Sequence, residues 1–175
     1  LGYINGYPDG AFRPDNRITR AEFVSILNMV LDLNKVPNLS DPGSSPSQAA
    51  PSFSDVGPAD WFYDAVKKTV LAGIVKGYGN NLFKPNKEIT REELATMMAN
   101  ALAGCYEAGS KMNEKTGFTD DGSISGWARG SVAVAVKYGL VNGYPDNSFK
   151  PQGSATRAEA CTIITNYLNL SKPTP

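Results

Sequence analysis

The chain has 175 residues, 41% of them hydrophobic, and 17 lysines and arginines balance 17 aspartates and glutamates. A chain of this length can bury roughly 70% of its unfolded surface, so a core without disulfides or metal ions is feasible. The balanced charge gives little support to capture of nucleic acid or an anionic membrane, and the absence of histidine and of a CxxC pair argues against zinc and Cys–His catalysis.

The first predicted element is a turn and loop that the chain repeats three times with unchanged spacing. The turn begins at a glycine followed by an aromatic residue, and proline, glycine or asparagine next to it favour a tight turn. A phenylalanine, a basic residue, a proline and finally an arginine follow at fixed distances, so the chain has a repeat architecture. The repeated positions are Gly6, Gly77 and Gly143; Tyr7, Tyr78 and Tyr144; Phe12, Phe83 and Phe149; Arg13, Lys84 and Lys150; Pro14, Pro85 and Pro151; and Arg20, Arg91 and Arg157.

Each loop leads into a predicted amphipathic helix. The Thr-Arg-x-Glu sequence at Thr19–Glu22 predicts a capping box, in which threonine and glutamate satisfy the first backbone N–H groups of the helix. An apolar stripe with helical spacing follows, and we expect the three stripes to pack together about a pseudo-threefold axis. The stripes are Phe23, Ile26, Leu27 and Val30; Leu94, Met97, Met98 and Ala101; and Ala160, Ile163, Ile164 and Tyr167.

Two loops separate the repeats, and the second and third repeats open with a further predicted helix. Residues 35–52 and 104–117 lack periodicity and are expected to be surface spacers. Apolar residues at helical spacing predict outer helices over Trp61–Val75 and Trp127–Val141, which end at Gly77 and Gly143. A disulfide between Cys105 and Cys161 is the less favoured alternative to a small buried Cys161.

The first repeat lacks a counterpart of Phe53–Leu71. We therefore expect the native chain to continue upstream of Leu1 with a similar segment. No apolar run reaches eighteen residues and no apolar leader opens the chain, so any export signal is also expected outside it.

These repeated residues, with the Thr-Arg-x-Glu sequence that closes each copy, strongly resemble the S-layer homology (SLH) family of bacterial surface proteins over nearly the whole chain. The resemblance implies a mainly α-helical module with pseudo-threefold symmetry, in which three repeats surround a central three-helix bundle and outer helices and loops form grooves between repeats. Residues 1–175 would form one such module, with repeats at 1–34 (incomplete), 53–103 and 118–170.

The resemblance also implies a function without catalysis, metal or cofactor. The family binds a secondary cell-wall polymer attached to peptidoglycan, typically through pyruvylated N-acetylmannosamine, and so tethers a fused cargo protein outside the cell, in the wall or S-layer. Neither nucleic acid nor membrane insertion is expected.

The repeated arginines are the main ligand candidates. A guanidinium on the first helical turn opposes the helix dipole, so its recurrence needs a cause, and bidentate binding of a carboxylate or phosphate supplies one. The alternative is a structural ion pair with an aspartate of a neighbouring repeat. The phenylalanines of the loops are expected to anchor in the core. The full candidate set is Arg20, Arg91 and Arg157; Arg13, Lys84 and Lys150; Trp61 and Trp127; Tyr7, Tyr78 and Tyr144; and Gly6, Gly77 and Gly143.

For several of these residues a structural role competes with ligand binding. Trp61 and Trp127 could equally pack in the core, and the glycines could simply end helices. Among functions, a structural lattice module without glycan specificity is the main rival. A wall-active enzyme is weaker, since no pair of carboxylates stands out apart from the caps, and no calcium-loop pattern occurs.

Overall fold

A computed structural model of the chain describes residue 4 and residues 6–33, 52–102 and 115–170. In these ranges the chain forms five α-helices and one short 3-10 helix, and its β-structure is limited to isolated bridges. The prediction of a mainly helical fold is therefore confirmed. The chain divides into two compact units, unit 1 (residues 1–12 and 19–88) and unit 2 (residues 13–18 and 89–175). The pseudo-threefold arrangement stays a prediction.

The helices that follow the loops begin where the capping boxes predict. Helix α1 (Arg20–Val30) has Thr19 as its N-cap; the Thr19 N–H donates to the Glu22 carboxylate at 2.7 Å, and the Glu22 N–H donates to the Thr19 hydroxyl. The same reciprocal bonds join Thr90 to Glu93 and Thr156 to Glu159. The helices that they start are α3 (Arg91–Leu102) and α5 (Arg157–Leu170).

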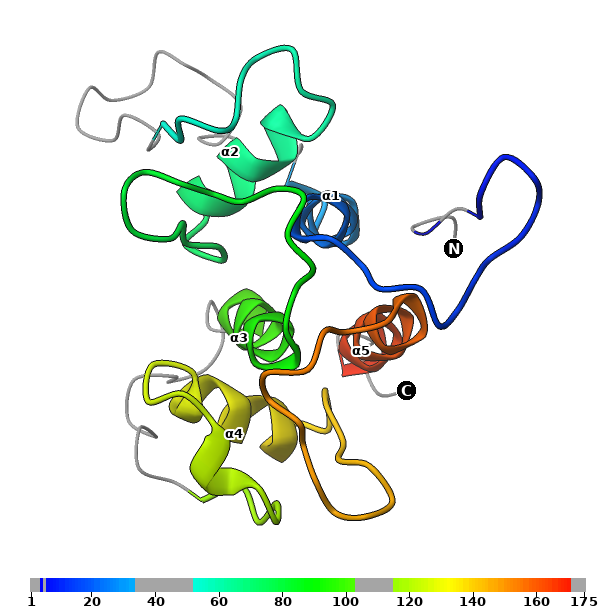
Figure 1. Ribbon diagram of the computed structural model, residues 1–175, viewed down its shortest axis with the longest axis vertical. Coiled ribbons are helices and arrows are strands. Elements are labelled where there is room, and N and C mark those ends of the chain that lie inside the picture. The colour runs from blue at the N-terminus through cyan, green and yellow to red at the C-terminus, as the bar shows by residue number, and fades with distance from the viewer. Residues whose placement is uncertain (1–3, 5, 34–51, 103–114, 171–175) are drawn as a thin grey trace. The chain divides into compact units, whose positions relative to one another are not determined.

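In unit 1, helix α2 (Tyr63–Leu71) packs against α1 (Figure 1). Phe23, Leu27 and Val66 are almost fully buried there. Each such side chain contributes about 1.5 to 3 kcal/mol through the hydrophobic effect, so this contact holds the unit together.

In unit 2, helices α4 (Arg129–Lys137) and α5 both contact α3. Met98, Val132 and Ile163 form part of the buried core. Cys161 on α5 has a half-buried free thiol, and Cys105 lies outside the described residues, as does the disulfide that would join them.

Helices α2 and α4 are shorter than the sequence predicted, and the prediction that they end at Gly77 and Gly143 is wrong. Helix α2 ends at Leu71, because Gly73 adopts a φ of 71° and the Ile74 N–H bonds back to the Thr69 carbonyl at 3.0 Å. This is a Schellman-type end, which needs a residue in the left-handed region. Gly139, with a φ of 64°, ends α4 in the same way.

An ionic clip fixes the loop before α4. The Asp121 carboxylate accepts hydrogen bonds from the N–H and hydroxyl of Thr116, at 2.9 and 2.7 Å, and pairs with Arg129 at 2.7 Å. The Thr116 bonds, helped by Arg129, lower the pKa of Asp121 from 3.8 to about 2 despite partial burial. The loop contains a 3-10 turn, η4 (Asp121–Ser123).

Candidate functional site

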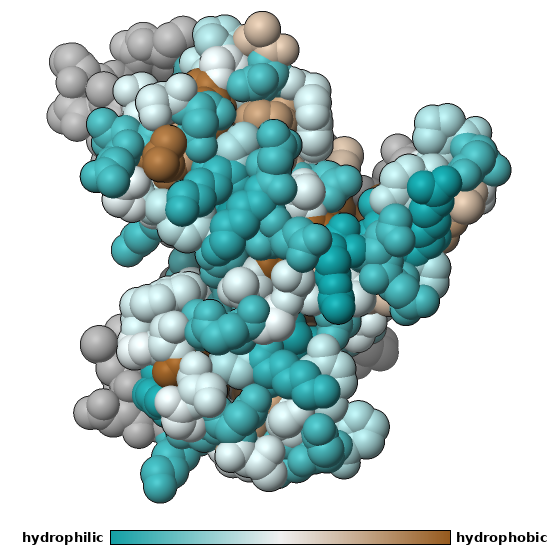
Figure 2. Space-filling model, in the orientation of Figure 1, coloured by the Kyte–Doolittle hydropathy of each residue, from teal (hydrophilic) through white to brown (hydrophobic). Residues whose placement is uncertain are grey.

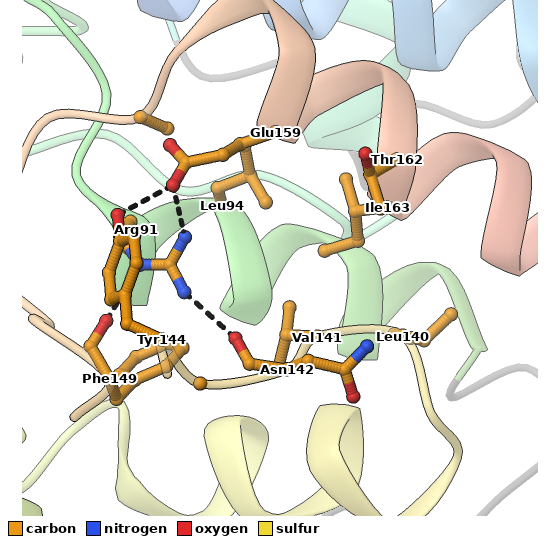
Figure 3. Close-up of a pocket in the computed structure, with 12 residues that line it drawn as sticks. Arg91, Leu94, Leu140, Val141, Asn142, Tyr144, Phe149, Glu159, Thr162 and Ile163 are labelled. Atoms are coloured by element: carbon orange, nitrogen blue, oxygen red, sulfur yellow. Dashed lines mark hydrogen bonds and ion pairs between the residues drawn. The ribbon is translucent and has the colours of Figure 1, made fainter. Parts of the chain in front are cut away.

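A cavity of about 190 Å³ lies in unit 2 where the second repeat meets the third. Arg91 enters it from the start of α3, Tyr144 and Phe149 from the loop after α4, and Glu159 from the first turn of α5 (Figure 3). Most of the other lining residues are apolar, including Leu140, and Asn142 and Thr162 are polar. The repeat boundary thus brings residues from three separate elements into one pocket.

Three hydrogen bonds hold the Arg91 guanidinium. It donates to the Phe149 carbonyl at 2.7 Å, to the Glu159 carboxylate at 2.6 Å and to the Asn142 carbonyl at 3.0 Å (Figure 3). Its side chain is only 11% exposed. The structural ion pair that the sequence left open therefore exists, with glutamate in place of aspartate. A guanidinium has five N–H groups, so these bonds use three of them.

Glu159 connects the arginine to a tyrosine. The Tyr144 hydroxyl donates to Glu159 at 2.6 Å. Burial acts to raise the pKa of Glu159, but the bonds from Tyr144 and the Thr156 backbone, with the charge of Arg91, lower it overall. Burial and the bond to Glu159 raise the pKa of Tyr144. At neutral pH the carboxylate is ionised and offsets the charge of Arg91.

Two cations lie near the Tyr144 ring. The Arg91 Cζ is 4.5 Å and the Lys150 Nζ 4.3 Å from its centroid, within the range of cation–π attraction. Lys150 has a φ of 54°, unusual for a residue with a side chain and more so before proline. Asp120 holds this conformation, since its carboxylate accepts from the N–H groups of Phe149 and Lys150, both at 2.7 Å.

Unit 1 repeats this arrangement where the first repeat meets the second. The Arg20 guanidinium donates to the carbonyls of Phe83 and Lys76, both at 3.0 Å, and lies 4.6 Å from the Tyr78 ring centroid. Lys84, with a φ of 58°, places its Nζ 4.8 Å from the same ring. Asp55 accepts from the N–H groups of Phe83 and Lys84, as Asp120 does in unit 2.

Gly77 and Gly143 are needed for close packing. A Cβ on Gly143 would lie 2.6 Å from a ring carbon of Phe118, and one on Gly77 would overlap the Phe53 ring. Sequence reasoning did not assign a role to these phenylalanines or to Asp55 and Asp120. The recurrence of Phe-Ser/Thr-Asp at the start of the second and third repeats is the signal that could have found them.

The phenylalanines of the loops differ between repeats. Phe83 and Phe149 are fully buried, as predicted, against Phe53 and Phe118, with ring centroids 5.6 and 5.3 Å apart. Phe12 is 36% exposed, so its predicted core role is wrong. The physical reason is that the sequence of the first repeat has no residue corresponding to Phe53.

The remaining candidates lie outside the described cavities. Trp61 and Trp127 are 69% and 60% exposed, so the alternative of core packing is wrong for both. Arg157 is buried, and its N–H donates to the Asn16 carbonyl at 2.8 Å. Of the first-repeat residues, Arg13 is exposed with a φ of 53°, Gly6 is exposed and Tyr7 is half-buried.

Together, the repeated capped helices and the arginine–tyrosine contacts at their boundaries define a helical repeat module. The chain belongs to the S-layer homology domain family, whose profile matches residues 1–24, 52–95 and 117–161. The three matched segments correspond to the three repeats, and the first is partial. SLH domains are non-catalytic modules.

Relatives carry this module within much longer proteins. The chain is 40% identical, over 96% of its length, to an amylopullulanase from Thermoanaerobacterium thermosulfurigenes, of which it spans 8%. It is 33% identical to both cell surface glycoprotein 1 and the cellulosome-anchoring protein of Acetivibrio thermocellus, over 95% of its length, and spans 7% and 35% of them. The module thus occurs in enzymes, in cell-surface and surface-layer proteins and in an anchoring protein. Among the described residues, no helix combines the length and apolar character that a membrane crossing requires.

Proposed function

We propose that the chain anchors a larger exported protein to the bacterial cell wall by binding a secondary cell-wall polysaccharide. Family membership supports attachment, and the names of the cell-surface and cellulosome-anchoring relatives support the location. The ligand that we infer is a glycan carrying pyruvylated N-acetylmannosamine, as the sequence resemblance implies.

The observation that carries this proposal is the arrangement found in both units. A shielded arginine and an exposed lysine lie close to the same half-buried tyrosine ring: Arg91 and Lys150 at Tyr144, Arg20 and Lys84 at Tyr78. A tyrosine pairs an apolar ring, suited to the C–H face of a sugar, with a polar tip. The cations suit the carboxylate of a pyruvyl ketal.

Within this arrangement we assign different roles to the two cations. Glu159 offsets the charge of Arg91 at 2.6 Å in unit 2, whereas the exposed Lys150 has only a longer, exposed contact with Asp146 at 4.0 Å. Lys150 therefore supplies most of the attraction for an anion. Arg91 fixes the pocket through the hydrogen bonds of its guanidinium. We extend the ligand role to the equivalent positions of the other repeats by sequence, which adds Arg157 and Arg13 to the set.

The test is a pull-down with purified wall material, native and chemically depyruvylated. Lys84→Gln with Lys150→Gln removes the lysine that follows the loop phenylalanine in each unit and leaves Lys87 near Tyr78. The double variant should weaken binding to native walls by about two- to thirtyfold, since each exposed charge pair is worth about 0.2 to 1 kcal/mol. Lys115→Gln with Lys137→Gln makes the same charge change elsewhere and should bind like the parent. Equal binding of the parent to both wall preparations would contradict the proposed ligand.

Self-assembly is a second candidate function, and the exposed indoles favour it. Trp61 and Trp127 could stack on a protein as well as on a sugar. Figure 2 shows a mainly hydrophilic face on which hydrophobic residues surface as small separate patches, whereas a broad apolar patch is typical of an interface. Sedimentation velocity without wall material separates the two functions: association that Trp61→Ala and Trp127→Ala abolish would favour assembly.

A further inference from the structure

We propose that unit 1 contains a second ligand site that binds a small carboxylate with an apolar side. It is separate from the arginine–tyrosine sites at Tyr78 and Tyr144. The site is a cavity of about 240 Å³ between the loop that opens the second repeat and the first turns of α2. Its lining includes Ser52, Phe53, Val56, Tyr63 and Lys67. The ligand class rests on the proposed function, because the ketal carboxylate of a wall sugar, with its methyl group, fits this description.

The charge of the cavity comes from a single lysine. Lys67 is the one charged residue among those that line it, and no carboxylate of the described residues pairs with the ammonium group. In unit 2, by contrast, Glu159 lies 2.6 Å from Arg91. An anion that enters the unit 1 cavity can therefore pair with Lys67, because no carboxylate is among the lining residues.

The walls suit the apolar side of such a ligand. The position of the Phe53 ring is fixed by two contacts. Its centroid lies 5.6 Å from that of Phe83, and the ring packs against Gly77. Val56 and Val66 add aliphatic surface, and Ser52 and Tyr63 bring hydroxyl groups to the lining. The volume is below the roughly 300 to 1,000 Å³ of pockets for drug-sized ligands, so one small substituent fits better than an oligosaccharide.

The third repeat provides an internal comparison. Alignment of the repeats through Phe53 with Phe118 and Trp61 with Trp127 places Asp121 at the position of Val56 and Arg129 at that of Tyr63. These two charged residues form the ionic clip of unit 2, with a distance of 2.7 Å. Ala133 takes the place of Lys67. Where the third repeat has an ion pair, the second repeat thus has Val56 and Tyr63, beside a lysine that no carboxylate of the described residues pairs with.

The experiment uses two probes, pyruvylated N-acetylmannosamine and N-acetylmannosamine itself, titrated into the 15N-labelled chain. The pyruvylated sugar should shift the amides of residues 52–67 in a saturable way. Lys67→Gln should weaken this response by roughly two- to fivefold, as expected for a partly exposed charge pair. Val56→Asp with Tyr63→Arg transplants the clip and should abolish it, while Lys137→Gln should leave it unchanged.

The outcomes separate this site from the proposed function. Unshifted amides at 52–67, an equal response to both sugars, or a Lys67→Gln variant that responds like the parent would each overturn the site. Pyruvate-dependent binding to walls would survive those results and still support the proposed function. If the clip variant unfolds by circular dichroism, the amide map and Lys67→Gln decide the matter.

Discussion

Replacing Arg91 with lysine tests whether the guanidinium primarily ties α3 to the loop after α4. The three acceptors lie 2.7, 2.6 and 3.0 Å from its nitrogens, in different directions. Lysine keeps the charge and can pair again with Glu159, but one ammonium cannot also reach the carbonyls of Phe149 and Asn142. Two bonds from a charged donor, each worth about 1.5 to 3 kcal/mol and reduced here by partial exposure, give an expected loss of about 2 to 4 kcal/mol in the free energy of unfolding.

Urea denaturation followed by circular dichroism measures this loss, with the slope checked against the parent. Arg17→Lys is the matched control, because Arg17 is exposed and its guanidinium donates to the Ser154 carbonyl at 2.7 Å. That variant should lose less than about 1 kcal/mol, as exposed contacts do. If Arg91→Lys proved no less stable than the control, the guanidinium would not stabilise the contact between α3 and the loop after α4. The hypothesis that Arg91 serves mainly to bind a ligand would then be favoured.

Two further predictions concern unit 2. Gly143→Ala should destabilise the chain by about 1 to 3 kcal/mol, since the new methyl group would overlap the Phe118 ring and approach the Ser148 carbonyl. Thermal melts measure the loss. Gly122→Ala is the control and should melt like the parent, because the space around Gly122 is open. Because the pKa of Asp121 is lowered from 3.8 to about 2, its contribution to stability is complete above about pH 4 and fades as the pH falls toward 2. Asp121→Asn should therefore be less stable than the parent at pH 6 and nearly equal to it at pH 2 in urea titrations, and a constant difference would contradict the assignment.

Local signals made the inner helices predictable. The capping boxes and apolar stripes lie within a few residues of one another, so sequence spacing alone predicts where α1, α3 and α5 begin and most of the residues that they bury. The last residue of each stripe, Val30, Ala101 or Tyr167, is only half-buried. The predicted ranges of α2 and α4 were too long, because apolar residues continue at helical spacing past Gly73 and Gly139, whose left-handed backbone ends the helices.

The sequence predicted the cations and tyrosines of the arginine–tyrosine sites, but not the contacts that hold them. The sequence identified Arg91 as unusual, but its partner Glu159 is 68 residues away and already had a complete role as a capping residue. Similarly, Asp120 acts on the backbone of Lys150 across 30 residues. Such contacts depend on the tertiary fold, so spacing within one repeat cannot reveal them. Because Arg20 and Arg91 donate hydrogen bonds to the next repeat, replacing them is expected to affect stability as well as binding.

Each arginine–tyrosine site takes its arginine from one repeat and the tyrosine and carbonyls around it from the next. The site is therefore a property of a junction, and a single repeat excised from the chain would carry only halves of sites. Duplicating a repeat in register would create a complete new junction without remodelling its neighbours. If the sites bind a repetitive polymer as proposed, each occupied site raises the effective concentration of that polymer at the next one, and added repeats would increase the avidity.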